Sequence, residues 1–328
     1  MNNPLLAEFK TPFESSPFSK IKIEHFIPAI KESIEIALQE IHKITVQKEV
    51  PTFENTLEKL EKCGKLIGRN TSLLFNLNSA ETSDELQQIT QQASPMLTKF
   101  QNDIRLNNKL FERIQSIYQN EDRLELSTEQ ITLLEKEYKS FVRNGANLNL
   151  ESKEKLRKID AELSQLSLTF GENVLADTRA FHLHIEKEGD LKGLPSAIIE
   201  MAAEEAQSRQ KTGWVFTLDY PSYVPFMTYS ENRVLRKKFS LAFGQRGFQD
   251  NPQNNSEIIK KIVQLRKKRA NLLGYKSHAA FVLEERMAQS EENVKNFLDK
   301  LSEKSKPAAE KEWENMKVFA FKKLNIVQ

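Results

Sequence analysis

Apolar residues recur along most of the chain at the spacing of an α-helix. In the clearest case the apolar positions are three or four residues apart, at Leu156, Ile159, Leu163, Leu166, Phe170 and Val174. Such steps keep one apolar stripe on one helix face, which packs against a core. Shorter stripes occur at Leu57, Leu60 and Ile67, at Ile131, Leu134, Tyr138 and Phe141, and at Ile262, Leu265 and Leu272. The pattern predicts a mainly α fold, an elongated bundle of several long helices.

The helical pattern is interrupted in the middle of the chain. Residues 180–185 alternate with a period of two, and residues 214–218 are rich in strand-forming side chains. We expect these segments to pair as an antiparallel ribbon, with a helix at roughly 194–210 between them. The sequence therefore predicts a small two-stranded β element near residues 180–218.

Two hydroxyl residues have the spacing expected at the start of a helix. Thr82 is followed three residues later by Glu85, and Ser127 by Gln130, as in a capping box. We expect a helix to begin after each hydroxyl. Pro95 lies inside a periodic stretch, where its ring removes one backbone hydrogen bond. We therefore expect two helices around Pro95, or one bent helix.

Three successive parts are expected along the chain. Residues 1–23 contain three prolines and alternating apolar positions, which predict an extended arm lying on the body. Residues 24–175 are expected to form an amino-terminal helical domain. Residues 176–328 are expected to hold the β-ribbon and further helices, the start of a larger body.

The composition is that of a soluble globular protein, with 39% hydrophobic and 29% charged residues. The 48 Lys and Arg residues nearly balance the 46 Asp and Glu residues, so no global field favours nucleic acid or an acidic membrane as partner. No run approaches the roughly 18 apolar residues that span a membrane. The start lacks the basic and apolar segments of a secretory signal. These features predict a cytoplasmic protein with no nucleic-acid or membrane partner.

The cysteine and histidine residues offer little catalytic chemistry. Cys63 is the single cysteine, which favours a reducing compartment, and it lies in a helical run where such residues are usually small core residues. His182 and His184 would share one strand face and could ligate a metal, but no third ligand is evident nearby. We interpret them as partly exposed strand histidines. No two of the histidines are four positions apart: His25, His42, His182, His184 and His278.

The charged clusters are interpreted as solvated surface. Neighbouring carboxylates at Glu204 and Glu205, and at Glu284 and Glu285, diverge around a helix axis. The four consecutive cations at 266–269 likewise spread around a helix and form no stripe for phosphate contact. There is no G-x-S-x-G elbow and no phosphate-cradling glycine loop. The sequence assigns no catalytic, cofactor-binding or metal-binding residue.

Residues 219–227 combine two prolines with two tyrosines. Tyrosines present apolar faces with hydroxyl tips, which suit the lining of a peptide-binding cleft. The alternative is a well-packed loop that anchors the ribbon to the next helix. We take Tyr220, Tyr223 and Tyr229 as candidates for a substrate-channel wall.

Short motifs along nearly the whole chain resemble those of one enzyme family. They lie at residues 3–6, 12–13, 17–18, 21–29, 51–56, 107–111, 141–146, 219–223 and 266–274. Together they look like the amino-terminal half of the thimet-oligopeptidase-like zinc metallopeptidases, the group that contains bacterial oligopeptidase A and peptidyl-dipeptidase. That family carries its zinc-binding H-E-x-x-H motif in the carboxy-terminal half, and the motif does not occur in these 328 residues.

The resemblance implies a helical body around a deep channel that admits short peptides and excludes folded proteins. It implies that this half forms one channel wall, while the other half carries zinc and the acid-base glutamate. We therefore expect the amino-terminal portion of a zinc-dependent oligopeptidase or peptidyl-dipeptidase, truncated before the zinc-binding region and inactive alone. The expected partners are short peptides and the missing catalytic half, in a protein that is monomeric when complete.

Two alternatives remain open from the sequence. The chain could be a noncatalytic helical peptide-binding protein, or one half of a split peptidase. An apolar stripe near the carboxy terminus argues mildly against the first alternative, because it predicts a last helix without part of its packing surface. The stripe consists of Trp313, Met316, Phe319 and Ala320.

Overall fold

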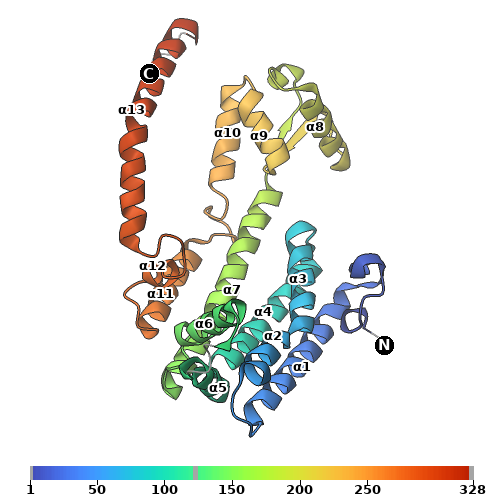
Figure 1. Ribbon diagram of the computed structural model, residues 1–328. Coiled ribbons are helices and arrows are strands. Elements are labelled where there is room, and N and C mark those ends of the chain that lie inside the picture. Colours follow the sequence, from blue (N-terminus) through green and yellow to red (C-terminus); the bar gives the residue numbers. More distant parts are fainter. Residues whose placement is uncertain (1–2, 121–124, 325–328) are drawn as a thin grey trace. The chain divides into compact units, whose positions relative to one another are not determined.

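The computed structural model describes residues 3–120 and 125–324, and these are mainly α-helical, as predicted (Figure 1). By its internal contacts the chain divides into two compact units, residues 1–265 and 266–328. The domain boundary expected between residues 175 and 176 falls inside helix α7 (Leu150–Ala180). The backbone hydrogen bonds of the helix continue across that position.

The amino-terminal arm is a series of 3-10 turns joined by extended residues. The turns are η1 (Pro4–Leu6), η2 (Pro12–Glu14), η3 (Phe18–Lys20) and η4 (Ile23–His25). Leu5 is fully buried in the core beneath the arm. Arg69 fixes the first turn, since its Nη2 donates to the carbonyl oxygens of Leu5 at 2.7 Å and Ala7 at 2.9 Å. Its guanidinium also lies 4.0 Å from the ring centroid of Phe9.

Two apolar cores lie within the first helices of the larger unit. The first joins the arm to α1 (Phe26–Val46), α3 (Lys65–Ala80) and α4 (Asp84–Arg105). The second joins the end of α1 to the π-helical turn η5 (Phe53–Glu58), α5 (Asn108–Gln119) and α6 (Thr128–Arg143). The short helix α2 (Lys59–Lys62) follows η5 and leads into α3.

The two predicted helix starts have different outcomes. Ser127 caps α6 as predicted, because its Oγ accepts from the Gln130 backbone N–H and the Gln130 side chain bonds back to the Ser127 N–H. The prediction that a helix begins after Thr82 as its cap is wrong. The adjacent Ser83 caps α4 instead, because its Oγ accepts from the Leu86 N–H at 3.2 Å. Thr82 instead donates to Asn78 Oδ1.

Helix α4 runs through Pro95 as a single helix. Of the two expected outcomes, the structure therefore excludes a division into two helices at this proline. Helix α4 packs along α7, and polar side chains contribute to the contact between the two helices. The Ser94 and Ser164 hydroxyls lie 2.6 Å apart, and Arg157 pairs with Asp103 at 2.7 Å. Polar matching of this kind fixes the two helices relative to one another along their length.

Helix α7 also buries two charged side chains. Lys153 Nζ donates to the Leu106 carbonyl oxygen at 3.2 Å, where α4 ends, and to Asn108 Oδ1. Near the other end of α7, Asp177 accepts from the Gly247 N–H at 2.6 Å and from Asn251 Nδ2 at 2.8 Å. Both charges are therefore hydrogen-bonded, as burial requires.

The predicted ribbon is confirmed. Strands β1 (His182–Ile185) and β2 (Trp214–Thr217) pair antiparallel, with His182 opposite Thr217 and Ile185 opposite Trp214. The turn η7 (Glu188–Leu191) and helix α8 (Ser196–Ser208) connect the strands, close to the predicted 194–210. A third core forms under α8, α9 (Tyr220–Tyr229) and α10 (Arg233–Gly244), with fully buried side chains at Phe216, Phe226 and Phe239.

The last helices are α11 (Ser256–Leu272), which contains the division between the units, α12 (His278–Leu283) and α13 (Glu291–Leu324). On α13 the apolar stripe is exposed, with Trp313, Met316 and Phe319 between 50% and 59% accessible. Across residues 3–120 and 125–324, no helix combines the length and apolarity needed to cross a membrane.

Candidate functional site

The tyrosine segment is a helix and not the loop that the sequence suggested. Tyr220 begins α9, Pro221 occupies its first turn and Pro225 lies inside it. Proline is well tolerated in a first turn, since the N–H it lacks would have no partner there. Ser222 fixes the junction with β2, because its Oγ accepts from the Thr217 N–H at 3.0 Å. Pro221 therefore marks the start of a helix, and Pro225 lies within it.

The three tyrosines do not form one surface. Tyr223 is half-buried and stacks on Phe243, with ring centroids 4.0 Å apart and planes within 14°. Tyr220 is exposed and meets the edge of the same Phe243 ring at 6.0 Å. Tyr229 is also exposed, but nine residues after Tyr220 it lies on the opposite side of the helix. Their assignment to a channel wall stays a prediction.

The two strand histidines lie on the same face of β1 and are partly exposed, as interpreted from the sequence. His182 Nε2 lies 2.6 Å from Lys211 Nζ, and His184 Nε2 lies 2.7 Å from the Thr212 carbonyl oxygen. Burial and the nearby Lys211 charge lower the pKa of His182. Both rings thus have protein partners of their own, and the neutral form of His182 is favoured near neutral pH.

The charged clusters also have structural neighbours. Glu205 pairs with Arg209 at 2.6 Å on α8, and Glu284 accepts from the Tyr275 hydroxyl at 2.6 Å. On α11, the Arg269 guanidinium lies 5.1 Å from the Phe281 ring centroid. These contacts are of the kind that stabilise surfaces, and none of them forms a catalytic arrangement.

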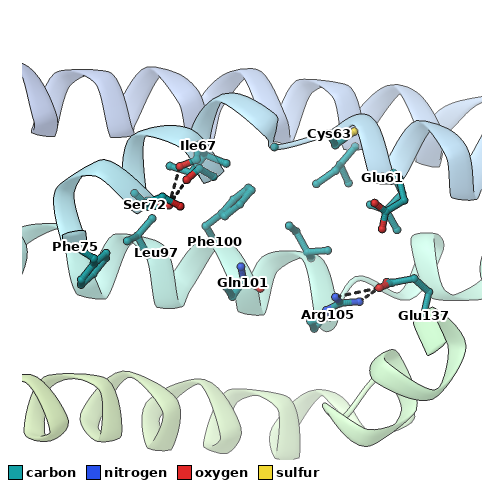
Figure 2. A pocket seen from close by; sticks show the side chains of 16 residues that line it. Glu61, Cys63, Ile67, Ser72, Phe75, Leu97, Phe100, Gln101, Arg105 and Glu137 are labelled. Carbon is teal, nitrogen blue, oxygen red and sulfur yellow. Dashed lines mark hydrogen bonds and ion pairs between the residues drawn. The ribbon is translucent and has the colours of Figure 1, made fainter. Parts of the chain in front are cut away.

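A pocket that the sequence did not reveal lies between α3 and α4. It has a volume of about 560 Å³ and is lined by residues of α1, α2, α3, α4 and α6. Figure 2 shows Ile67 from α3 above Leu97 and Phe100 from α4, with the Arg105 and Glu137 pair at one end. A volume of this size is typical of sites for small ligands or single peptide side chains.

A break in the backbone opens one wall of the pocket. α2 ends at Lys62, and Gly64 has φ 78°, a left-handed conformation that suits glycine, before α3 begins at Lys65. One turn further on, a side-chain carbon at Gly68 would meet nothing within 4 Å. The pair of glycines four residues apart was the only sequence signal for this site.

Cys63 lies at this break and not in a helical run, which corrects the expectation from sequence. It caps the end of α2, since the left-handed turn at Gly64 separates the two helices. Burial, together with the charge and hydrogen bond of Glu40, raises the pKa of the Cys63 thiol to about 12. The thiol is therefore protonated at neutral pH and cannot serve as a nucleophile.

Both polar and apolar side chains line the pocket. Arg105 Nη1 donates to Glu137 Oε2 at 2.6 Å, and the Arg105 guanidinium lies 4.9 Å from the Phe141 ring centroid. Gln101 and Ser72 also line the pocket. The arrangement suits a group that is apolar along most of its length and polar at the end near Arg105 and Glu137, and it supplies no acid, base or nucleophile pair for chemistry.

Comparison with known proteins gives matches over the whole chain. The model of the family described as "Peptidase family M3" matches residues 226–327. Oligopeptidase A of Escherichia coli K12 is 30% identical over 324 residues, which are 98% of this chain and 47% of that protein. Oligopeptidase A of Haemophilus influenzae is 32% identical over 332 residues, covering 100% of this chain and 48% of its own length. Residues 226–327 thus match peptidase family M3, and the chain as a whole is similar to proteins named oligopeptidase A.

A second kind of M3 protein is also similar to the chain. Dipeptidyl carboxypeptidase of Escherichia coli K12 is 31% identical over 297 residues, which are 90% of this chain and 44% of that protein. The chain described here thus spans about half the length of the curated relatives it matches.

Proposed function

We propose that this chain is the amino-terminal portion of a zinc-dependent oligopeptidase or peptidyl-dipeptidase that hydrolyses short peptides in the cytoplasm. In this proposal it forms one wall of the substrate channel and is inactive alone. The observation that carries the proposal is similarity over 98% of the chain to an oligopeptidase A of which it matches 47%. The remaining half of such a protein would supply the catalytic chemistry.

The residues of the described chain do not fit a zinc site. Among residues 3–120 and 125–324, no three His, Cys, Asp or Glu side chains are grouped so that they could hold a metal ion. Structural and catalytic zinc sites need three or four such ligands. The proposal therefore assigns zinc, and the glutamate that would act with it, to the half that is not represented here.

The proposed role of the present half is to hold the peptide. The pocket between α3 and α4 has room for an apolar side chain beneath the Arg105 and Glu137 pair. Tyr220 and Tyr229 expose rings on opposite sides of α9, so either ring, but not both as one surface, suits contact with an extended peptide. Such contacts would restrict and orient a substrate without taking part in bond cleavage.

The exposed stripe on α13 supports the expectation of a further packing partner. Trp313, Met316 and Phe319 are at least half accessible on one helix, whereas apolar side chains spaced in this way usually lie against another element. In the proposal, part of the catalytic half covers this stripe in the complete protein.

A hydrolysis assay with a quenched fluorescent peptide tests the proposal. The purified 328-residue chain should give no cleavage with or without added zinc. A longer chain that continues into an H-E-x-x-H segment should cleave the peptide and lose this activity with a chelator. Zinc-dependent, chelator-sensitive cleavage by the 328-residue chain itself would show that the proposed division of labour is wrong.

Mixing experiments separate the alternatives. Recovery of activity when a separately produced second half is added would favour a split peptidase. Binding of a labelled peptide by the chain, combined with no hydrolysis in any combination, would favour a noncatalytic peptide-binding protein. Replacement of Gly68 by Leu should fill the pocket and weaken that binding, while Gly171→Leu, also at a helical glycine with open space, is the matched control.

A further inference from the structure

The outer face of α10 carries a short apolar stripe between cations. Val234 and Leu241 are seven residues apart, so they lie on the same side of the helix, and they are 76% and 50% exposed. Lys237 and Lys238 are exposed on either side of this line. Arg233 lies one turn before Lys237 and is also exposed. The face is therefore apolar along its centre and basic along both edges.

The opposite face of α10 fully accounts for the packing of the helix. Phe239 is completely buried, and Phe243 stacks on Tyr223. Leu235 and Ala242 belong to the same core. Val234 and Leu241 lie outside this core, and they are notable because they are flanked by exposed cations on the same face.

The cations of this face have no carboxylate partner within the described part of the chain. Two carboxylates near the start of α10 have other partners, since Glu231 pairs with Lys192 at 2.8 Å and Asp190 accepts from Asn232 Nδ2 at 2.9 Å. Residues 233–246 contain five cations and no acidic residue. Among the described residues, no ion pair involves Arg233, Lys237 or Lys238.

The position of these cations lowers the stability of helix α10. Arg233 and Lys237 lie in the first turns of α10, where the helix dipole is positive and favours acidic residues. They are also four residues apart, so their like charges repel one another. An anionic ligand along this face would reverse both effects, which makes the charge pattern better suited to a bound partner than to the free helix.

We propose that the outer face of α10 binds an acidic peptide segment that carries apolar side chains between its carboxylates. Carboxylates would pair with Arg233, Lys237 and Lys238, and an apolar side chain would cover Val234 and Leu241. The surface is narrow, so the partner is a single extended or helical segment. The inference does not rest on the proposed peptidase function, because it concerns binding alone.

A peptide fits this face better than a lipid surface does. Helices that lie in a membrane interface insert large apolar residues such as Phe, Trp and Leu. On α10, both phenylalanines, Phe239 and Phe243, face the core, and the exposed apolar residues are only Val234 and Leu241. Too little apolar area is left for insertion into a bilayer.

Fluorescence anisotropy with a short labelled peptide, in which pairs of Glu alternate with Leu or Phe, tests the proposal. The 328-residue chain should bind this peptide and should not bind the same peptide with Gln at every Glu position. Added salt should weaken the binding, because exposed charge pairs are screened. The variant Lys237→Glu/Lys238→Glu should weaken it on the order of tenfold or more. Leu241→Ser should weaken it less.

Matched controls make the result decisive. Lys31→Glu/Lys43→Glu reverses two exposed cations on α1 and changes the net charge by the same amount, but it should leave binding unchanged. The α10 reversal should keep the thermal midpoint at or above that of the parent chain, since it places acids near the start of the helix. No binding of the Glu peptide, or equal losses in the two reversals, would overturn the proposal. Binding to phosphatidylserine vesicles in place of the peptide would overturn it in favour of a lipid surface.

Discussion

The two longest helices of the described chain, α7 with 31 residues and α13 with 34, both carry apolar stripes, yet they use them differently. On α7, which packs against α4, Leu156 is fully buried, the rest of the stripe is partly buried, and even the charged Lys153 and Asp177 are buried and hydrogen-bonded. On α13 the residues Trp313 and Met316 remain at least half exposed. A periodic stripe thus predicts that a helix has a packing face, but not that the partner is present.

The comparison also shows what anchors a long helix. Polar contacts mark both ends of α7, at Lys153 near its start and at Asp177 near its end, and an unmade bond at either site would be costly because the groups are buried. The stripe of α13 has apolar side chains only, which bind any complementary apolar face. We expect α7 to be fixed in one arrangement and α13 to depend on what covers it.

The largest effect should come from Leu156, the fully buried residue of the α7 stripe. Leu156→Ala removes a fully buried side chain and should lower the free energy of unfolding by about 2–5 kcal/mol, through lost transfer energy and a remaining cavity. Leu150→Ala is the matched control on the same helix, because Leu150 is 76% exposed. Urea denaturation measures both. If both variants lost a similar free energy of unfolding, burial would not explain the effect of Leu156→Ala.

The next largest effect is expected at the carboxy-terminal anchor of α7. Asp177→Ala leaves the Gly247 N–H and the Asn251 amide without their acceptor, and should cost about 2–3 kcal/mol. Chemical denaturation measures the loss. Glu151→Ala, which removes an exposed carboxylate on the same helix, should cause no measurable change. An unchanged free energy of unfolding in Asp177→Ala would mean that these hydrogen bonds do not stabilise α7.

Lys153 should give a smaller loss with a distinctive pH dependence. Burial, and secondarily the charge of Arg157, lowers the pKa of Lys153 from its ordinary value of 10.5. Just below pH 10.5 the unfolded chain therefore binds more protons than the folded chain, so the free energy of unfolding should rise as pH increases toward that value.

Lys153→Met should remove this rise and should cost about 1 kcal/mol at neutral pH, because the Leu106 carbonyl loses a donor while a buried charge is also removed. Denaturation midpoints across the alkaline range test the point. A rise of the same size in Lys153→Met would assign the pH dependence to other groups.

The smallest effect is expected on α13. Met316→Ser/Phe319→Ser should change the free energy of unfolding of the chain by less than about 0.5 kcal/mol, since both side chains are already exposed to solvent. The same variant should impair recovery of activity when a catalytic half is added, if that half covers the stripe. A loss of more than about 1 kcal/mol in the chain alone would show that the stripe is already covered in solution.

Local patterns predicted those parts of the fold that local forces determine. The period of two at residues 180–185 predicted β1, and the spacing of Ser127 and Gln130 predicted the start of α6. Thr82 failed because Ser83, the next residue, can also cap a helix, and sequence alone does not choose between adjacent hydroxyls. Two prolines at 221 and 225 favour a loop on sequence alone, although a proline in a first turn, such as Pro221, is equally compatible with a helix.

The pocket could not have been predicted, because its walls come from distant parts of the sequence. Cys63 and Glu137 reach it from α2 and α6, and whether the space between α3 and α4 is filled depends on how side chains pack. Gly64 and Gly68 gave the only local indication, and single glycines have many uses. Likewise, the exposure of Val234 and Leu241 on α10 depends on which face of the helix meets the core.

The protected state of Cys63 makes the chain well suited to site-directed labelling. Its pKa of about 12 leaves almost no thiolate at neutral pH, so a maleimide dye would react far faster with a cysteine placed on the surface. Lys31 in the larger unit and Lys300 in the smaller one are exposed sites for such cysteines. A dye pair at these two positions would report the separation of the units by energy transfer without the native thiol having to be removed.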